Sequence, residues 1–230
     1  MNEVTAAKRT GRHTSRPRKY DSAASRANII AVATHEFATN GLSGARIDEI
    51  AAKTRTSKRM IYYYFGGKHS LYRHVLEAAY GRVRAGEEQL ELDHMPPIEA
   101  LRKLIEFTFI HHSQNPDFVR LIMIENIHHA QYLKGLQGIE SLNVRAVEHL
   151  ERIYGAGRTA GVFRDGLQPL AIHWLISALA FFNVSNRATF SMVFNWALSR
   201  PEGQDRLKDQ VVETILRYVL EPDLIEKHCS

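Results

Sequence analysis

The sequence predicts an all-α protein in which three short helices precede a larger helical body. Apolar residues recur at helical spacing, as in Ile30, Ala33, Phe37 and Ala38, which share one face of a helix. The helical stretches are separated by Gly, Pro and Asn residues that end helices. The chain has no run of alternating apolar and polar residues long enough to predict a strand, and it has no internal repeat.

Residues 21–75 are expected to form a helix-turn-helix unit. Asp21 or Ser22 can cap the first helix, and Asn40-Gly41 ends it with a left-handed turn. A link of three residues, Arg55-Thr56-Ser57, separates the second helix from the third, and this spacing is typical of a helix-turn-helix. The helices are expected over residues 22–41, 47–54 and 57–65, with a longer one starting at Lys68 after Gly66-Gly67.

Residues 76–230 are expected to form the helical body. Its breaks are Met95-Pro96-Pro97, Asn115-Pro116 and the Gly-rich segment 155–166, which we expect to be a loop. The helices of the body are expected over residues 98–113, 116–125, 136–154, 168–185 and 204–220.

The positive charge of the chain is concentrated at its start. Residues 1–20 hold six of the 30 Lys and Arg residues and one of the 25 acidic residues, so the rest of the chain is balanced at 24 of each. A segment so rich in charge and so poor in apolar residues is expected to be disordered when free. It is either a solubilising leader or an arm that gains DNA affinity by releasing counterions from phosphates.

Cysteine usage and hydropathy favour a cytoplasmic protein without a membrane span. The single cysteine, Cys229, has no partner for an internal disulfide, which fits a reducing compartment. The longest apolar stretch covers residues 170–184 and is interrupted by His173 and Ser177. It is short for a bilayer and is more typical of a buried or interfacial helix.

The third helix has an apolar face and an outward-facing basic and aromatic face. With Ile61 at the centre of the buried face, Phe65 lies about 40° away, while Arg59 and Tyr63 point outward and Met60 and Tyr62 lie on the flanks. An exposed tyrosine hydroxyl beside basic residues is a good donor to phosphate. The face is therefore a candidate for contact with a nucleic acid.

The run SKRMIYYYFGGKHSLY at 57–72 closely resembles the signature of the TetR family of transcriptional regulators. The usual form in that family is Ser-Lys-Gly-Thr-Leu-Tyr-Tyr-His-Phe followed by Lys and an apolar residue, and the spacing also matches upstream to Phe37. By this resemblance the residues expected to contact DNA are Arg46, Thr56, Ser57, Lys58, Arg59, Met60, Tyr62, Tyr63, Tyr64 and Lys68.

The chain departs from the family pattern at four places. Arg59-Met60 replaces a small Gly-Thr pair that approaches the bases, which implies an unusual operator preference. Tyr64 replaces a histidine, and Ala45-Arg46 replaces a Thr-Thr pair, which exchanges a capping hydroxyl for an arginine that can seek phosphate. Arg55-Thr56 replaces Gly-Val, so the turn lacks the residue that adopts a left-handed conformation at least cost.

The resemblance implies a homodimer that binds a palindromic operator in double-stranded DNA and is released from it by a small molecule of unknown identity, with no cofactor and no catalytic residue. The body then supplies both the ligand pocket and the dimer contacts. Candidate ligand contacts are Phe107, His111, Phe118, Met123, Asn126, Trp174 and Phe181. Candidate dimer contacts are Leu175, Leu179, Phe182, Val212, Ile215, Leu216 and Val219; alternatively, their helices are ordinary core helices.

Two other functions are compatible with the sequence. Glu125, His128 and His129 have the i, i+3, i+4 spacing of metal ligands on one helical face, and Glu91 and His94 repeat part of it, as in a helical-bundle metalloenzyme. The second alternative is a DNA-binding regulator without a small-molecule ligand. No Ser/His/Asp signature, phosphate-binding Gly loop or zinc-type Cys pair is present.

Overall fold

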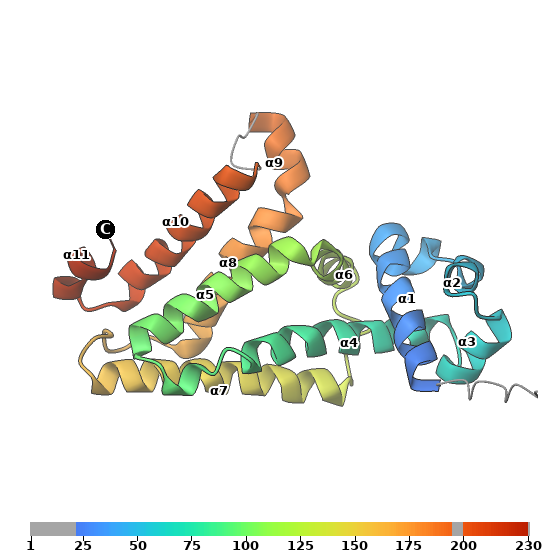
Figure 1. Cartoon of the computed structure of the whole chain (residues 1–230), viewed down its shortest axis with the longest axis horizontal. Helices are drawn as coiled ribbons and strands as arrows, with labels where there is room; N and C mark the ends of the chain where they lie inside the picture. Colours follow the sequence, from blue (N-terminus) through green and yellow to red (C-terminus); the bar gives the residue numbers. More distant parts are fainter. Residues whose placement is uncertain (1–21, 195–199, 230) are drawn as a thin grey trace, which may run out of the picture.

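The computed structural model describes residues 22–194 and 200–229. The described chain is helical, and its only strand-like feature is an isolated bridge between Phe163 and Leu220, which confirms the predicted all-α class. The α-helices are α1 (Ser22–Gly44), α2 (Ile47–Thr54), α3 (Lys58–Phe65), α4 (Lys68–Glu88), α5 (Pro97–Gln114), α6 (Pro116–Ile127), α7 (Gln137–Thr159), α8 (Pro169–Ser185), α9 (Arg187–Phe194), α10 (Pro201–Val219) and α11 (Ile225–His228), with 3-10 turns at Leu92–His94 and Pro222–Leu224 (Figure 1).

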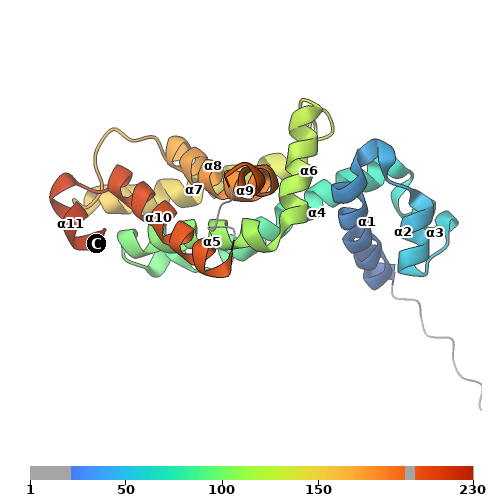
Figure 2. The same ribbon diagram turned by 90° about the horizontal axis from the view of Figure 1, so that it is seen from above.

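Helices α1, α2 and α3 form a small unit at one end of the molecule (Figures 1 and 2). Ile29, Ala33 and Phe37 of α1 are fully buried against Ile50 and Ile61 of α2 and α3. The predicted stop at Asn40-Gly41 is a kink, since Gly41 has φ 66° and ψ 174° inside α1. The three predicted helices are therefore present, and the first runs three residues beyond its predicted end at residue 41.

Helix α4 leaves the small unit and continues without a break into the body, while α6 lies beside α1 in both views (Figures 1 and 2). Phe118, Val119 and Leu121 of α6 are buried in the same hydrophobic core as α1 to α4. The core of the small unit is thus completed by a helix that begins about 50 residues after the unit ends in the sequence.

The body has its own core around α5, which packs against α7, α8 and α10. Ile105 and Phe109 of α5 contribute to it together with Ile172 and Ile176 of α8, all of them at most 3% exposed. Within the described residues, no helix combines the length and the apolar character that crossing a membrane requires.

The structure corrects two predicted elements of the body. Residues 155–159 belong to α7 and are not part of a loop, because Gly157 serves close packing: a Cβ there would lie 1.9 Å from Phe163 Cδ2. Helix α9 was not predicted. The last long helix begins at Pro201, three residues before the predicted start, with its Pro in the first turn.

Candidate DNA-binding surface and ligand cavity

Helix α3 presents the predicted face outward. Ile61 and Phe65 are 1% and 3% exposed, whereas Tyr63 is 78% exposed and Arg59 lies on the same open face. The Ser57 hydroxyl caps the helix by accepting a hydrogen bond from the Met60 amide at 3.3 Å. The predicted orientation of α3 is confirmed, with an arginine and a tyrosine at the centre of its exposed side.

The turn before α3 contains a left-handed residue that is not glycine. Arg55 has φ 52° and ψ 35°, and its amide donates to the Ala52 carbonyl at 3.2 Å. The Thr56 amide donates to the Ala51 carbonyl at 3.0 Å, which closes the end of α2. The turn keeps the geometry that the family pattern assigns to glycine, at the steric cost of a Cβ in this region.

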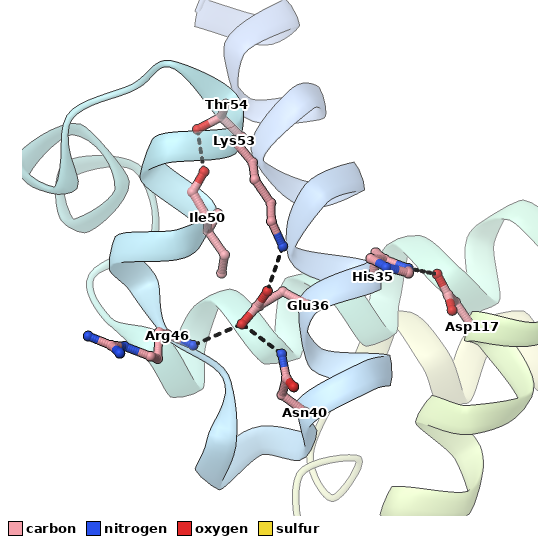
Figure 3. Close-up of polar contacts among 8 residues, drawn as sticks. All are labelled: His35, Glu36, Asn40, Arg46, Ile50, Lys53, Thr54 and Asp117. Atoms are coloured by element: carbon pink, nitrogen blue, oxygen red, sulfur yellow. Dashed lines mark hydrogen bonds and ion pairs between the residues drawn. The ribbon is translucent and has the colours of Figure 1, made fainter.

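A buried carboxylate fixes α2 against α1. Glu36, 3% exposed, accepts hydrogen bonds from Asn40 Nδ2 at 2.9 Å, the Arg46 amide at 3.3 Å and Lys53 Nζ at 3.1 Å (Figure 3). Burial by itself raises the pKa of Glu36, but the hydrogen bonds from Lys53, Arg46 and Asn40 together outweigh it, so the pKa lies below its usual value. The carboxylate therefore joins both ends of α2 to α1.

The basic residues around α3 differ in what they contact within the protein. Lys58 forms an ion pair with Asp48 at 3.0 Å, and this hydrogen-bonded pairing raises the pKa of Lys58. Lys68 Nζ donates to the Ser43 carbonyl at 3.0 Å. The Arg46 side chain points away from Glu36, although the backbone amide of Arg46 donates a hydrogen bond to the Glu36 carboxylate (Figure 3).

The other predicted contact residues lie on the flanks of α3. Tyr62 is 44% exposed, while Met60 and Tyr64 are half-buried. Tyr64 packs edge-on against Tyr63 with ring centroids 5.5 Å apart. The Thr56 hydroxyl donates to the Thr54 carbonyl at 3.3 Å.

The body contains a cavity of about 390 Å³ near the small unit. Helices α4, α5, α6, α7 and α8 all contribute to its wall. The lining residues are Tyr80, Val83, Arg84, Glu87, Thr108, His112, Phe118, Ile122, Val147, Leu170, His173, Ser177 and Phe181. A smaller hollow of about 220 Å³ shares four of these residues and adds Asn126, Trp174 and Ala178, so it extends the cavity toward the outer side of α8.

The predicted ligand contacts divide between this cavity and other places. Phe118 and Phe181 line it, and Asn126 and Trp174 line its extension. His111 instead lines a separate hollow between α1, α4 and the α5–α6 corner. Phe107, which lies beside His111 with ring centroids 5.6 Å apart, and Met123, which packs on the core of the small unit, line none of these hollows.

The polar residues of the cavity were missed by sequence reasoning. Arg84 and Glu87 lie on α4, Thr108 and His112 on α5, and His173 and Ser177 on α8. The available signal was polar residues at helical spacing within apolar faces, such as His173 and Ser177 between Leu170 and Phe181.

The charges of the cavity balance one another. Arg84 and Glu87 form an ion pair, with burial raising the pKa of Glu87 against the influence of Arg84. Burial lowers the pKa of His112, and it lowers the pKa of His173 to about 4. Both histidines are therefore neutral at pH 7. Arg84 Nε is buried and has no hydrogen-bond partner in the described structure.

Comparison with known proteins decides the family. The model of the bacterial regulatory proteins of the tetR family matches residues 29–75, and the tetracyclin repressor-like C-terminal domain model matches residues 97–215. The chain belongs to the TetR family of bacterial transcriptional regulators. The first match covers α1 from residue 29, all of α2 and α3, and the start of α4, where the resemblance was noted in the sequence.

Two curated relatives of this TetR-family chain are transcriptional repressors. One is the HTH-type transcriptional repressor NicS of Pseudomonas putida, 36% identical over 166 residues, which are 72% of this chain and 78% of the relative. The other is the HTH-type transcriptional repressor SCO4008 of Streptomyces coelicolor, 28% identical over 217 residues, with 86% of this chain and 97% of the relative covered.

Solved structures share the fold. The putative regulator SCO4942 of Streptomyces coelicolor has a TM-score of 0.65 at 24% identity, covering 85% of this chain and 98% of its own. The ketosteroid regulator KstR2 of Mycobacterium tuberculosis also has a TM-score of 0.65, at 17% identity, covering 88% of this chain and 97% of its own. The family match and the two repressor relatives together make the TetR-family chain a DNA-binding transcriptional regulator, and the enzyme alternative is not favoured.

The predicted metal-ligand face does not exist in this TetR-family chain. Helix α6 ends at Ile127, and His129 has φ 53°, so Glu125, His128 and His129 do not share one helical face. The Glu125 carboxylate is buried and accepts hydrogen bonds from Tyr72 Oη at 2.9 Å and the Tyr132 amide at 3.2 Å.

Glu91 and His94, which repeat part of the metal-ligand spacing, do not share a helical face either. Glu91 has φ 51°, and His94 ends a 3-10 turn, so this pair is not on an α-helix either. Over residues 22–194 and 200–229 no three His, Cys, Asp or Glu side chains converge as metal ligands.

The residues of α10 that were predicted as dimer contacts lie in the core of a single protomer. Val212, Ile215, Leu216 and Val219 are at most 1% exposed and pack with α5 and α8. On α8, Leu179 and Phe182 are 36% and 51% exposed, while Leu175 is partly buried. Further exposed apolar residues on α8 and α9 are Leu170, Trp174, Met192, Val193 and Phe194.

Proposed function

We propose that this regulator is a cytoplasmic homodimeric repressor that binds a palindromic operator through α3 and releases it when a small molecule fills the cavity. The observation that carries the proposal is the exposed face of α3, where Arg59 and Tyr63 lie opposite the buried Ile61 and Phe65. Repression is supported by the two curated relatives, both of which are repressors. Two copies of α3 would enter successive major grooves, about 34 Å apart.

Different residues around α3 would contact the bases and the phosphates of the operator. Arg59 and Met60 would read base edges, and an arginine suits guanine because it can donate two hydrogen bonds to O6 and N7. Tyr63 and Arg46 would bind phosphates on either side. Lys58 and Lys68 would have to exchange Asp48 and the Ser43 carbonyl for phosphate oxygens. Thr56, Ser57, Tyr62 and Tyr64 would complete the contacts at the edges of this surface.

Release by a ligand requires a mechanical link between the cavity and α1. Helix α6 is in a position to supply it, since Phe118 and Ile122 line the cavity while Asp117 on the same helix binds His35 Nδ1 at 2.9 Å (Figure 3). The Glu125 carboxylate at the other end of α6 binds Tyr72 of α4, whose ring packs edge-on against Phe37 of α1 at 5.1 Å. A shift of α6 would therefore tilt α1, and with it α3.

The dimer would form through α8 and α9. Leu175, Leu179 and Phe182 remain the proposed contacts, joined by the exposed Trp174 on the same helix. Burial of exposed aromatic and aliphatic side chains of this size is typical of homodimer interfaces. The outward face of α10, which carries Asp209, Thr214 and Arg217, is polar and would lie at the rim.

The test is DNA affinity after a change at the centre of the surface. An operator is first selected from a random DNA pool, and binding of the labelled duplex is followed by fluorescence anisotropy. Tyr63→Ala should weaken binding about tenfold or more per lost charged hydrogen bond. The matched control is Tyr218→Ala, since Tyr218 is also exposed but lies on α10.

Lys68→Ala should also weaken binding while leaving the helical content unchanged. Wild-type affinity in both the Tyr63→Ala and Lys68→Ala variants would refute the assignment of α3 as the DNA-binding element.

A further inference from the structure

The charged side chains of the cavity wall pair with each other, and His112 has one ring nitrogen that makes no hydrogen bond within the described residues. Among the described residues of its wall, the charged ones are Arg84 and Glu87, which are paired with each other on α4. His112 and His173 are neutral because burial disfavours their charged forms. A charged ligand would bring an uncompensated charge into a site whose own charges are already paired, which is costly.

The hydrogen bond of His112 fixes which of its ring nitrogens can act as an acceptor. His112 Nδ1 lies 2.7 Å from the Thr108 carbonyl oxygen, one turn earlier on α5. A carbonyl oxygen only accepts, so Nδ1 carries the proton, and in the neutral ring Nε2 carries the lone pair. His112 lines the cavity, and among the described residues no side chain or backbone group forms a hydrogen bond with Nε2.

The walls around His112 are aromatic. The Phe118 ring lies edge-on to His112 with centroids 5.6 Å apart, and Tyr80 and Phe181 also line the cavity. A volume of about 390 Å³ is near the lower end of the range for ligand pockets and has room for a single substituted ring.

We infer that the effector is a small, uncharged ring compound that donates an O–H or N–H hydrogen bond to His112 Nε2. The inference rests on the proposed ligand role of the cavity. It assigns His112, which sequence reasoning missed, as the residue that selects the ligand by its hydrogen-bond donor. A ring of the same size without a donor would leave a buried acceptor unpaired, and sites built this way reject such analogues.

The experiment compares three probes of one ring each with the full-length protein at pH 7.5, by ligand-observed NMR titration. Phenol is neutral and donates, anisole is neutral and cannot donate, and benzoate is charged. A phenol is un-ionised at this pH, like a tyrosine side chain with a pKa of about 10. Phenol should bind about tenfold more tightly than anisole, and benzoate should bind most weakly.

Two variants of His112 distinguish the effect of its hydrogen-bond acceptor on ligand affinity from the effect of its packing. The amide of His112→Asn can replace Nδ1 as donor to Thr108 but does not reach the Nε2 position, so the phenol-to-anisole affinity ratio should fall to about one. His112→Gln reaches that position with an amide oxygen and should keep part of the preference. Circular dichroism reports whether each variant is folded.

Several results would overturn the inference: equal affinities of phenol and anisole for wild type, tightest binding of benzoate, no binding of any probe, or an undiminished ratio in His112→Asn. The wild-type probe series decides on its own if a variant does not fold. Operator binding is measured separately without probe, so its loss would refute the proposed function, while a probe failure with intact operator binding would refute only this inference.

Discussion

Replacing Glu36 by Gln tests how the helix-turn-helix is held together. The substitution keeps the shape of the side chain but removes the charge from a group that accepts three hydrogen bonds. A hydrogen bond to a charged group contributes about 1.5–3 kcal/mol, whereas the bond from Lys53, which is 50% exposed, contributes less, roughly 0.2–1 kcal/mol. A glutamine oxygen still accepts from two donors, so we expect a loss of about 2 kcal/mol.

The loss is measured as thermal unfolding followed by circular dichroism. For a chain of this size, about 2 kcal/mol corresponds to a decrease in Tm of roughly 4–8 °C. Because the folded-state pKa of Glu36 is lowered, its contribution is present above the unfolded pKa and is lost as pH falls through the folded pKa. The difference between wild type and variant should therefore shrink in acid below about pH 4.

The control is Glu148→Gln, a change of the same kind at an exposed position of α7. A Tm for Glu36→Gln within one degree of this control at pH 7 would refute the argument. So would a difference that stays constant down to the acid limit.

Three further predictions concern the turn, the base contact and the basic arm. Arg55→Gly should stabilise the protein by up to about 1 kcal/mol in urea unfolding, since glycine adopts the left-handed conformation without steric cost; destabilisation would contradict the assigned backbone. Arg59→Gly should relax specificity at one operator position per half-site by about 1–3 kcal/mol, as measured on single-base operator variants, and an equal loss on all sequences would instead make Arg59 a phosphate contact. Residues 1–20 lie outside the described residues; if they form a DNA arm, deleting residues 2–20 should flatten the slope of log K against log salt by about 0.9 for each lost phosphate contact, whereas an unchanged slope would indicate a solubilising leader.

Helical periodicity in the sequence was sufficient to predict features that depend on a single helix. The orientation of α3 follows from the 100° step between residues once Ile61 is placed inside, and Tyr63 is exposed as that step requires. Helical periodicity could not predict which other helix an apolar face packs against. Helix α10 does have an apolar face at Val212, Ile215 and Val219, but that face packs on α5 of its own protomer.

The cavity was predicted poorly because it depends on how helices pack. Arg84, His112 and His173 come from α4, α5 and α8, and nothing local to any of them indicates that they meet. Gly157 was taken for a loop residue because glycine is common in loops, whereas here the missing side chain makes room for Phe163. Local composition does not distinguish these two uses of glycine.

The place of α6 in the core of the small unit has a consequence for making hybrid regulators. Val119 and Leu121 are fully buried there beside Leu71 and Tyr72, so a cut after residue 75 would remove part of that core and leave the rest open to water. The segment that recognises DNA is therefore not a transferable module. A chimera that joins residues 22–75 of this chain to another body will fold well only if that body supplies a helix with matching apolar side chains and a carboxylate for the Tyr72 hydroxyl. In lineages that exchanged such segments, α6 and α1 would have had to change together.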